Sequence, residues 1–171
     1  MILLAANLAV PAPAGVETIP TPTAEAMLDA AIALADVDVA ILAAAVADYR
    51  PAEALGGKRP KDDAAWTVEL EPTVDVAKRL GEAKHAGQLL VTFGAEIGAE
   101  GLERKRSMLD TKNADLVVFN DVSRPDIAFD AVENEVVLVT RLGERPVAKA
   151  PKPAIAAAIL DEVERLLGAE P

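Results

Sequence analysis

The chain of 171 residues has no cysteine, one histidine and few aromatic residues, at 3% of the total. The lack of cysteine excludes disulfides, thiolate nucleophiles and cysteine-ligated zinc, and a single histidine excludes a multi-histidine metal site within one chain. A Ser-His-Asp hydrolase would depend on His85, which we interpret as a surface residue of a helix-to-strand loop. A chain without cysteine suits a reducing compartment, and we expect a cytoplasmic protein.

Several other signatures are missing. The sequence contains no run of 18 apolar residues, which predicts no membrane span, and its start lacks the basic segment of a signal peptide. Neither G-x-x-x-x-G-K-[ST] nor G-x-G-x-x-G occurs. Both the Walker A loop and the dinucleotide fingerprint are therefore excluded, which argues against a nicotinamide-dependent oxidoreductase on a similar sheet.

The charge of the chain is acidic overall but unevenly placed. There are 28 acidic and 17 basic residues, for a net charge of −11, which argues against nucleic acid as a partner. Eight of the 17 basic residues nevertheless lie in two short windows, 50–61 and 104–112. Two basic clusters in an acidic protein favour a small polyanionic ligand, and an ordinary solvated surface explains the same pattern equally well.

Short apolar runs alternate with helical patterns, and the single domain that we expect spans 1–171. This alternation predicts an α/β fold, a Rossmann-like three-layer parallel sheet, with a β-hairpin appended at 134–149. Strands are predicted at 2–5, 16–19, 39–45, 67–70, 89–93 and 116–119, and helices at 23–35, 73–81, 98–112 and 153–167.

Ligands of open α/β sheets bind beyond the carboxyl ends of the strands. This rule selects four segments: Ala44–Arg50, Thr73–Ala77, Phe93–Glu96 and Phe119–Ser123. Thr73 is predicted to be a helix N-cap that leaves the N–H groups of the first turn free for an anion, although an ordinary capped helix has the same sequence.

Two basic segments could complete such a site. Lys105, Met108 and Lys112 are spaced to share one face of the predicted helix 98–112, where two ammonium groups could hold a phosphate chain. A solvated helix face is the alternative. Gly56 and Gly57 beside Lys58 predict a flexible flap, and we interpret the nearby Trp66 as a packing residue.

Six motifs occur in an order that resembles one known family. They are AAAVADYRP at 43–51, Lys58 ten residues after the Asp of that motif, LEPTVDV at 70–76, VTFGAE at 91–96, TKNADLVVFNDVS at 111–123 and AFDAVENEVVLV at 128–139. Together they resemble the phosphopantothenate–cysteine ligase domain of bacterial coenzyme A biosynthesis, which is often fused behind a flavin-dependent decarboxylase.

The resemblance implies a reaction and a set of residues. The family uses CTP, with Mg²⁺, to join 4′-phosphopantothenate and cysteine through an acyl-cytidylate, and this domain holds no flavin. Lys58 would be the flap lysine that is important for activity. The nucleotide contacts would fall on Leu42, Ala43, Ala44, Asp48, Lys58, Val74, Asp75, Val76, Ala77, Phe93 and Lys112.

Two departures from the family pattern lead to further expectations. The family has a lysine where this chain has Met108, and Lys105 is the candidate to replace it. The first strand and the glycine- and serine-rich loop of the family are missing, so we expect a domain incomplete at its N-terminus. A non-catalytic nucleotide-binding fragment or scaffold is therefore the alternative function.

The hairpin at 134–149 is the predicted dimerisation element. Its first strand is apolar on both faces, since Val136 and Leu138 alternate with Val137 and Val139. An apolar ribbon alone in water invites pairing, so we expect a homodimer built around it.

Overall fold

The computed structural model of the protein describes residues 1–53, 55–123 and 131–168. The chain forms two compact units, which are described separately: residues 1–30 with 45–76, and residues 31–44 with 77–171. None of the helices in the described part of the chain combines the length and apolarity that a bilayer crossing requires.

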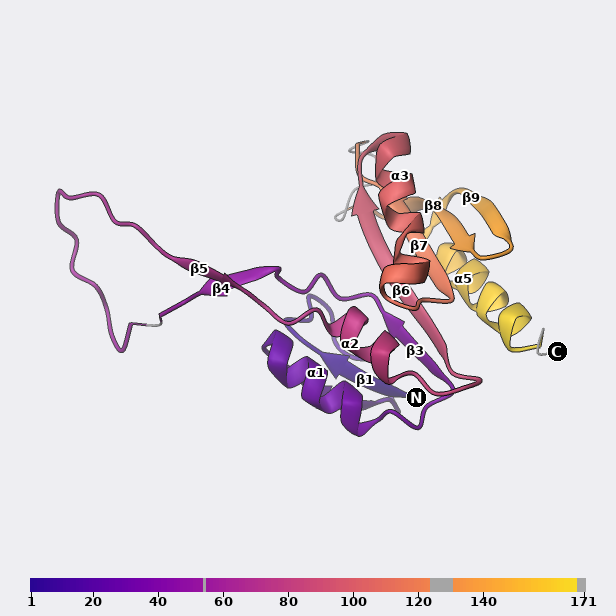
Figure 1. The fold of residues 1–171 in the computed structure, drawn as a ribbon, viewed down its shortest axis with the longest axis horizontal. Helices are drawn as coiled ribbons and strands as arrows, with labels where there is room; N and C mark the ends of the chain where they lie inside the picture. The colour runs from indigo at the N-terminus through magenta and orange to yellow at the C-terminus, as the bar shows by residue number, and fades with distance from the viewer. Residues whose placement is uncertain (54, 124–130, 169–171) are drawn as a thin grey trace. The chain divides into compact units, whose positions relative to one another are not determined.

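The second unit contains a five-stranded mixed sheet in the order β3-β6-β7-β8-β9 (Figure 1). The first three strands are parallel, and β8 and β9 continue the same sheet as an antiparallel hairpin. The strands are β3 (Val39–Leu42), β6 (Leu89–Glu96), β7 (Leu116–Asp121), β8 (Glu133–Thr140) and β9 (Gly143–Pro151).

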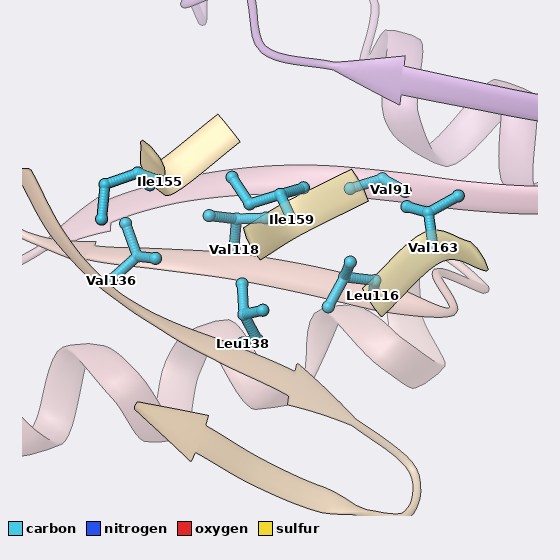
Figure 2. Packing of buried hydrophobic residues seen from close by; sticks show 8 residues of the cluster. All are labelled: Val91, Leu116, Val118, Val136, Leu138, Ile155, Ile159 and Val163. Carbon is cyan, nitrogen blue, oxygen red and sulfur yellow. The ribbon is translucent and has the colours of Figure 1, made fainter. Parts of the chain in front are cut away.

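Helices cover both faces of this sheet. On one face α5 (Lys152–Leu167) buries Ile155, Ile159 and Val163 against strand residues that include Val91 and Val118 (Figure 2). On the other face α3 (Gly98–Arg106) and α4 (Met108–Thr111) pack Leu102, Met108 and Leu109 against Val117 and Phe119. The predicted α/β class with three layers is confirmed, and so is the helix at 153–167.

The β8 strand has a different environment from the one its sequence suggested. Val136 and Leu138 belong to the cluster under α5, and Val139 belongs to the cluster under α3 and α4, with Val137 packed against it. Both apolar faces of β8 are thus covered within the chain, because its backbone pairs with β7 as well as β9. Its apolar pattern does not require a second copy, and β9 rather than β8 is the edge strand of the described sheet.

The first unit holds two small sheets. A parallel pair joins β1 (Ile2–Ala5) to β2 (Glu17–Pro20), and an antiparallel ribbon joins β4 (Tyr49–Pro51) to β5 (Leu70–Pro72). Thr23 caps α1 (Ala24–Ala33) as predicted, since its Oγ1 accepts the Ala26 N–H at 3.1 Å.

The segment between β4 and β5 differs from its prediction. Residues 52–53 and 55–69 form a long loop (Figure 1), and the strand predicted at 67–70 begins only at Leu70. The Trp66 prediction is wrong: its side chain is 59% exposed, with the Arg59 guanidinium 4.9 Å from the ring centroid. An indole can remain in water when a cation stacks on its face.

Two further elements differ from expectation. The helix predicted over 98–112 is broken at Ser107, whose Oγ donates to the Arg104 carbonyl at 2.7 Å and so competes with the helical backbone. The segment 39–45 is predicted to be a strand buried on both faces. In the structure the strand ends at Leu42, and residues Val39–Leu42 pair with β6. It is an edge strand of its sheet, and Ile41 is 44% exposed.

A buried carboxylate on α5 is paired with two arginines. The Glu162 side chain is 6% exposed and accepts hydrogen bonds from Arg165 and Arg145, at 2.5 and 3.2 Å for the shortest contacts. The hydrogen bond from Arg165 is the largest effect that lowers the pKa of Glu162 below its ordinary value of 4.5. A carboxyl group with a lowered folded-state pKa stabilises the fold above its unfolded pKa and loses that contribution as the pH falls through the folded value.

We therefore expect Glu162→Gln to destabilise the protein near neutral pH and to lose this disadvantage in acid. The quantity to measure is the free energy of unfolding in urea at intervals from about pH 7 to about pH 3. Glu164→Gln, at an exposed position of the same helix, is the matched control. A difference between wild type and Glu162→Gln that stays constant over this range would contradict the assignment.

Candidate nucleotide-binding site

The carboxyl end of β3 presents small residues beside an aromatic ring. Leu42 pairs with Thr92 of β6, so Ala43 and Ala44 leave the sheet next to Phe93. Both alanines are exposed, and Phe93 is 37% exposed although Thr92 before it is 1% exposed. A partly exposed ring next to two exposed alanines leaves room for a planar group to approach the backbone. The structure places Leu42, Ala43 and Phe93 at neighbouring positions of β3 and β6.

The next strand adds a polar group that sequence reasoning did not single out. Asn120 pairs with Ala95 in the carboxyl half of β7, within the predicted segment Phe119–Ser123. Its Oδ1 is buried and has no hydrogen-bond partner among the described residues. A buried acceptor without a partner is costly, so this atom is a candidate to receive a donor from a ligand. The sequence feature that could have identified Asn120 is the Asn120-Asp121 pair at the end of an apolar strand.

Lys105 lies across β6 on the face covered by α3. A Cβ placed on Gly94 would lie 2.6 Å from the Lys105 Cδ, so a side chain at position 94 would require the lysine stem to move. The Lys105 Nζ lies 3.4 Å from Glu96 Oε1, and Arg104 donates to Glu96 Oε2 at 3.0 Å. The hydrogen bond from Arg104 and the charge of Lys105 lower the pKa of Glu96. Lys105 is thus held near the carboxyl end of β6 by a carboxylate.

The ligand-holding face predicted for Lys105, Met108 and Lys112 is interrupted by the core. Met108 is 8% exposed within the core cluster under α4, and α4 ends at Thr111, one residue before Lys112. A methionine at this position gains more from apolar burial than from exposure beside a ligand. Lys105 is therefore held by Glu96, and Met108 belongs to the core.

Lys112 lies on a different side of this unit from Phe93. It follows α4 and precedes β7, and so belongs to the amino end of the parallel strands. Its backbone packs against α2 (Val76–Ala83), which carries Ala77 near its start. The structure therefore places Lys112 and Ala77 on elements in contact with each other.

In the first unit, Thr73 connects two of the predicted segments. Its N–H donates to the Asp48 carbonyl at 2.9 Å, and its hydroxyl donates to the Ala47 carbonyl. These bonds hold Asp48 beside the segment that begins at Val74. The prediction that Thr73 is an N-cap is wrong, since α2 begins at Val76 and the Thr73 hydroxyl bonds elsewhere. Asp48, Val74, Asp75 and Val76 lie in this unit, while Ala77 is the first α2 residue of the other unit.

Arg50 forms ion pairs that connect β4 with β5 and with α1, and the sequence reasoning missed these contacts. Its Nε donates to Glu71 across the ribbon at 2.9 Å, and its Nη1 pairs with Glu25 of α1. The hydrogen bond to Glu71 and the charge of Glu25 raise the pKa of Arg50. The sequence would have suggested this contact only if 70–72 had been recognised as the strand that pairs with 49–51.

Lys58 lies in the loop 52–69 and is exposed. The ribbon is paired only at its base, from Tyr49 with Pro72 to Pro51 with Leu70, so this loop carries Lys58 apart from Asp48. Within the first unit, the structure therefore does not bring Lys58 together with Asp48.

Comparison with known proteins identifies the family. A family model described as the DNA/pantothenate metabolism flavoprotein C-terminal domain matches residues 1–167. The chain belongs to this family. The resemblance inferred from the motifs is confirmed over nearly the whole chain. Residues 128–130 of the last motif lie outside the residues that the structure describes.

Named members of the family and solved structures agree with this result. The coenzyme A biosynthesis bifunctional protein CoaBC of Bacillus subtilis is 37% identical over 148 residues, which are 85% of this chain and 36% of that protein. A crystal structure of the C-terminal domain of CoaBC has a TM-score of 0.78 and 33% identity, and covers 99% of this chain and 75% of its own. The Cab2 H337A mutant in complex with phosphopantothenate-cysteine has a TM-score of 0.68 and 23% identity, over 90% of this chain and 53% of its own, and shows the same fold. The chain spans less than half of the length of the curated relatives it matches.

Proposed function

We propose that this chain binds CTP and catalyses the ligation of 4′-phosphopantothenate with cysteine in coenzyme A biosynthesis. The observation that carries the proposal is the end of β3, where Leu42, Ala43 and Ala44 lie beside the half-exposed Phe93 in a member of this family. Small residues let a pyrimidine base approach the backbone, whose N–H and C=O groups can read its edge. The compartment that we propose is the cytoplasm.

The reaction takes place in two steps. A carboxylate oxygen of 4′-phosphopantothenate attacks the α-phosphorus of CTP, the bond to the β-phosphate breaks, pyrophosphate leaves, and the acyl-cytidylate is formed. The amine of cysteine then attacks the acyl carbon, loses its proton, and displaces CMP to form the amide. Both steps need charge neutralisation and alignment more than a protein nucleophile, so a chain without cysteine is suited to them.

The basic residues have distinct roles in this proposal. Lys58 neutralises the triphosphate when the loop 52–69 closes, and Lys112 holds a phosphate from its place beside α2. The N–H groups at Val74–Ala77 and the Asp48 side chain complete the nucleotide contacts. Lys105 is paired with Glu96 and is the candidate to replace the family lysine.

Mg²⁺ is proposed to enter with the nucleotide. Among the described residues, no three histidine or acidic side chains lie close enough together to hold a metal ion. Mg²⁺ commonly binds through substrate phosphates and water with one or two carboxylates, and Asp48 and Asp75 are the acidic residues in the proposed contacts.

Two partners complete the proposal. The relatives named CoaBC are bifunctional and longer than this chain, which supports a flavin-dependent decarboxylase as a fused or separate partner. A homodimer is proposed around the hairpin at 134–149, with the exposed edge strand β9 as its contact, because an unpaired strand edge can pair with a second copy.

Calorimetric titration with CTP, UTP and ATP tests the nucleotide assignment. We expect CTP to bind at least about tenfold more tightly than ATP, because the larger purine does not fit a pocket that reads a pyrimidine edge. Ala44→Leu should weaken CTP binding by filling the space beside Phe93. Ala33→Leu adds the same side chain at an exposed position of α1 and is the matched control. Equal affinities for the three nucleotides would refute the pyrimidine pocket.

A non-catalytic nucleotide-binding scaffold is the second candidate function. The two candidates are separated by measuring pyrophosphate release with CTP, 4′-phosphopantothenate and cysteine present together. Release that depends on 4′-phosphopantothenate supports the ligase. CTP binding without release supports the scaffold.

A further inference from the structure

The turn that carries Lys112 is packed against α2 at a glycine. A Cβ on Gly81 would lie 1.8 Å from the Lys112 carbonyl oxygen and 2.7 Å from its carbonyl carbon. Both are backbone atoms, so any side chain at position 81 would push the turn and the helix apart. Alanine is the better helix former, yet only glycine permits this approach.

Hydrogen bonds hold the two elements at this separation. Asn113 has a φ of 49°, a left-handed conformation that asparagine tolerates, and its Nδ2 donates to the Gly81 carbonyl at 3.0 Å. Lys84 of the segment after α2 donates to the Asn113 carbonyl at 2.9 Å. The backbone on both sides of Lys112 is therefore anchored: its own carbonyl lies over Gly81, and the next residue is held by two bonds.

Asp115 extends this arrangement to the sheet. Lys84 Nζ lies 2.8 Å from both Asp115 carboxylate oxygens, and the two side chains are 12% and 25% exposed. One of these oxygens accepts the Leu90 N–H of β6 at 2.7 Å, and the Asp115 N–H donates to the Leu90 carbonyl at 2.9 Å. The same four residues thus join α2, the turn and β6, which are the elements that carry Ala77, Lys112 and Phe93.

We propose that Gly81, Lys84, Asn113 and Asp115 act together as positioning residues that set where Lys112 can reach a nucleotide phosphate. We call these four residues the Lys112 latch. The proposal rests on the proposed CTP function and deepens it. In this proposal the Lys112 latch fixes the distance between Lys112 and the start of α2. None of the four residues needs to touch the nucleotide.

A double-mutant cycle tests whether the latch acts through Lys112. CTP binding is measured by calorimetry for wild type, Gly81→Ala, Lys112→Ala and the double variant. We expect each single variant to bind CTP about tenfold more weakly, since a charge-assisted contact is lost or misplaced. The double variant should bind no more weakly than Lys112→Ala alone, because a latch cannot misplace a side chain that is absent.

Two further variants control for folding and for general loss of charge. Asn113→Gly keeps the left-handed backbone but removes the amide bond to Gly81, and should weaken CTP binding at least about threefold even if Gly81→Ala does not fold. Arg165→Gln removes one ion-pair partner of the buried Glu162 on α5 and should bind CTP like wild type. Melting temperatures of all variants show which of them remain folded.

The outcomes separate the latch from the proposed function. Absence of CTP binding by wild type overturns the nucleotide proposal and the latch with it. Normal CTP binding by the folded latch variants overturns the latch alone. If Gly81→Ala, or Asn113→Gly in its place, weakens binding as much in the Lys112→Ala background as in wild type, the four residues do not act through Lys112.

Discussion

Lys58→Ala is expected to lower kcat for pyrophosphate release by about 100- to 1,000-fold while leaving the fold intact. Removing one preorganised charge contact from a transition state costs about 3–4 kcal/mol, which corresponds to this range. Lys58 is exposed in the loop 52–69, where a substitution changes stability by no more than about 0.5 kcal/mol. A lysine that meets the triphosphate only on loop closure contributes mainly to the transition state, so KM for CTP should change less than kcat.

The control for this result is Lys61→Ala. Lys61 is exposed in the same loop, and its removal changes the net charge by the same amount. Activity close to wild type in Lys61→Ala would assign the effect to Lys58 itself rather than to the charge of the loop. An unchanged kcat in Lys58→Ala would remove this residue from the mechanism, and a large fall in its melting temperature would give it a structural role instead.

Val139→Asp is expected to unfold the second unit. Val139 is fully buried, pairs with Val117 and packs in the cluster that contains Leu109 and Phe119. The substitution removes about 2 kcal/mol of apolar burial and adds a carboxyl group that has no partner, for a total cost of more than about 4 kcal/mol. We expect a fall in Tm of about 10 °C or more, or a loss of soluble protein.

Val132→Asp provides the matched comparison, because Val132 is 83% exposed just before β8. It should leave the thermal unfolding curve unchanged. Light scattering at micromolar concentration, run beside the melting curves, distinguishes a folding effect from an effect on assembly. A Val139→Asp protein that melts like wild type but changes from dimer to monomer would place this residue at an intermolecular surface, contrary to its burial within the chain.

The hairpin shows where sequence reasoning reached its limit. The alternation of Val136 to Val139 correctly predicted a strand with two apolar faces. The sequence alone does not show whether a second copy or the chain itself covers those faces. The answer depends on the antiparallel pairing of β8 with β7, which places β8 between α5 and the α3–α4 pair. Such contacts join residues that are distant in the sequence, and a local pattern does not encode them.

The basic helix illustrates the same limit within a single element. Spacing alone put Lys105, Met108 and Lys112 on one face of a helix, but it does not show which neighbours cover that face. The structure buries Met108 in the cluster that contains Val117 and Phe119. Trp66 was misjudged in the opposite direction, since nothing in the sequence indicated that Arg59 would stack on its ring.

By itself, the sequence determined the α/β class, the family, and the small residues Ala43 and Ala44 near the end of a strand. These depend on local apolar periodicity and on the order of short motifs, both of which can be recognised in a linear chain. The tertiary structure alone decided that Thr73 bonds to the Ala47 and Asp48 carbonyls, that Arg50 connects Glu25 with Glu71, and that Gly81 lies against the Lys112 carbonyl. These are contacts between segments about 20 or more residues apart, and their energies depend on distances that exist only after the chain has folded.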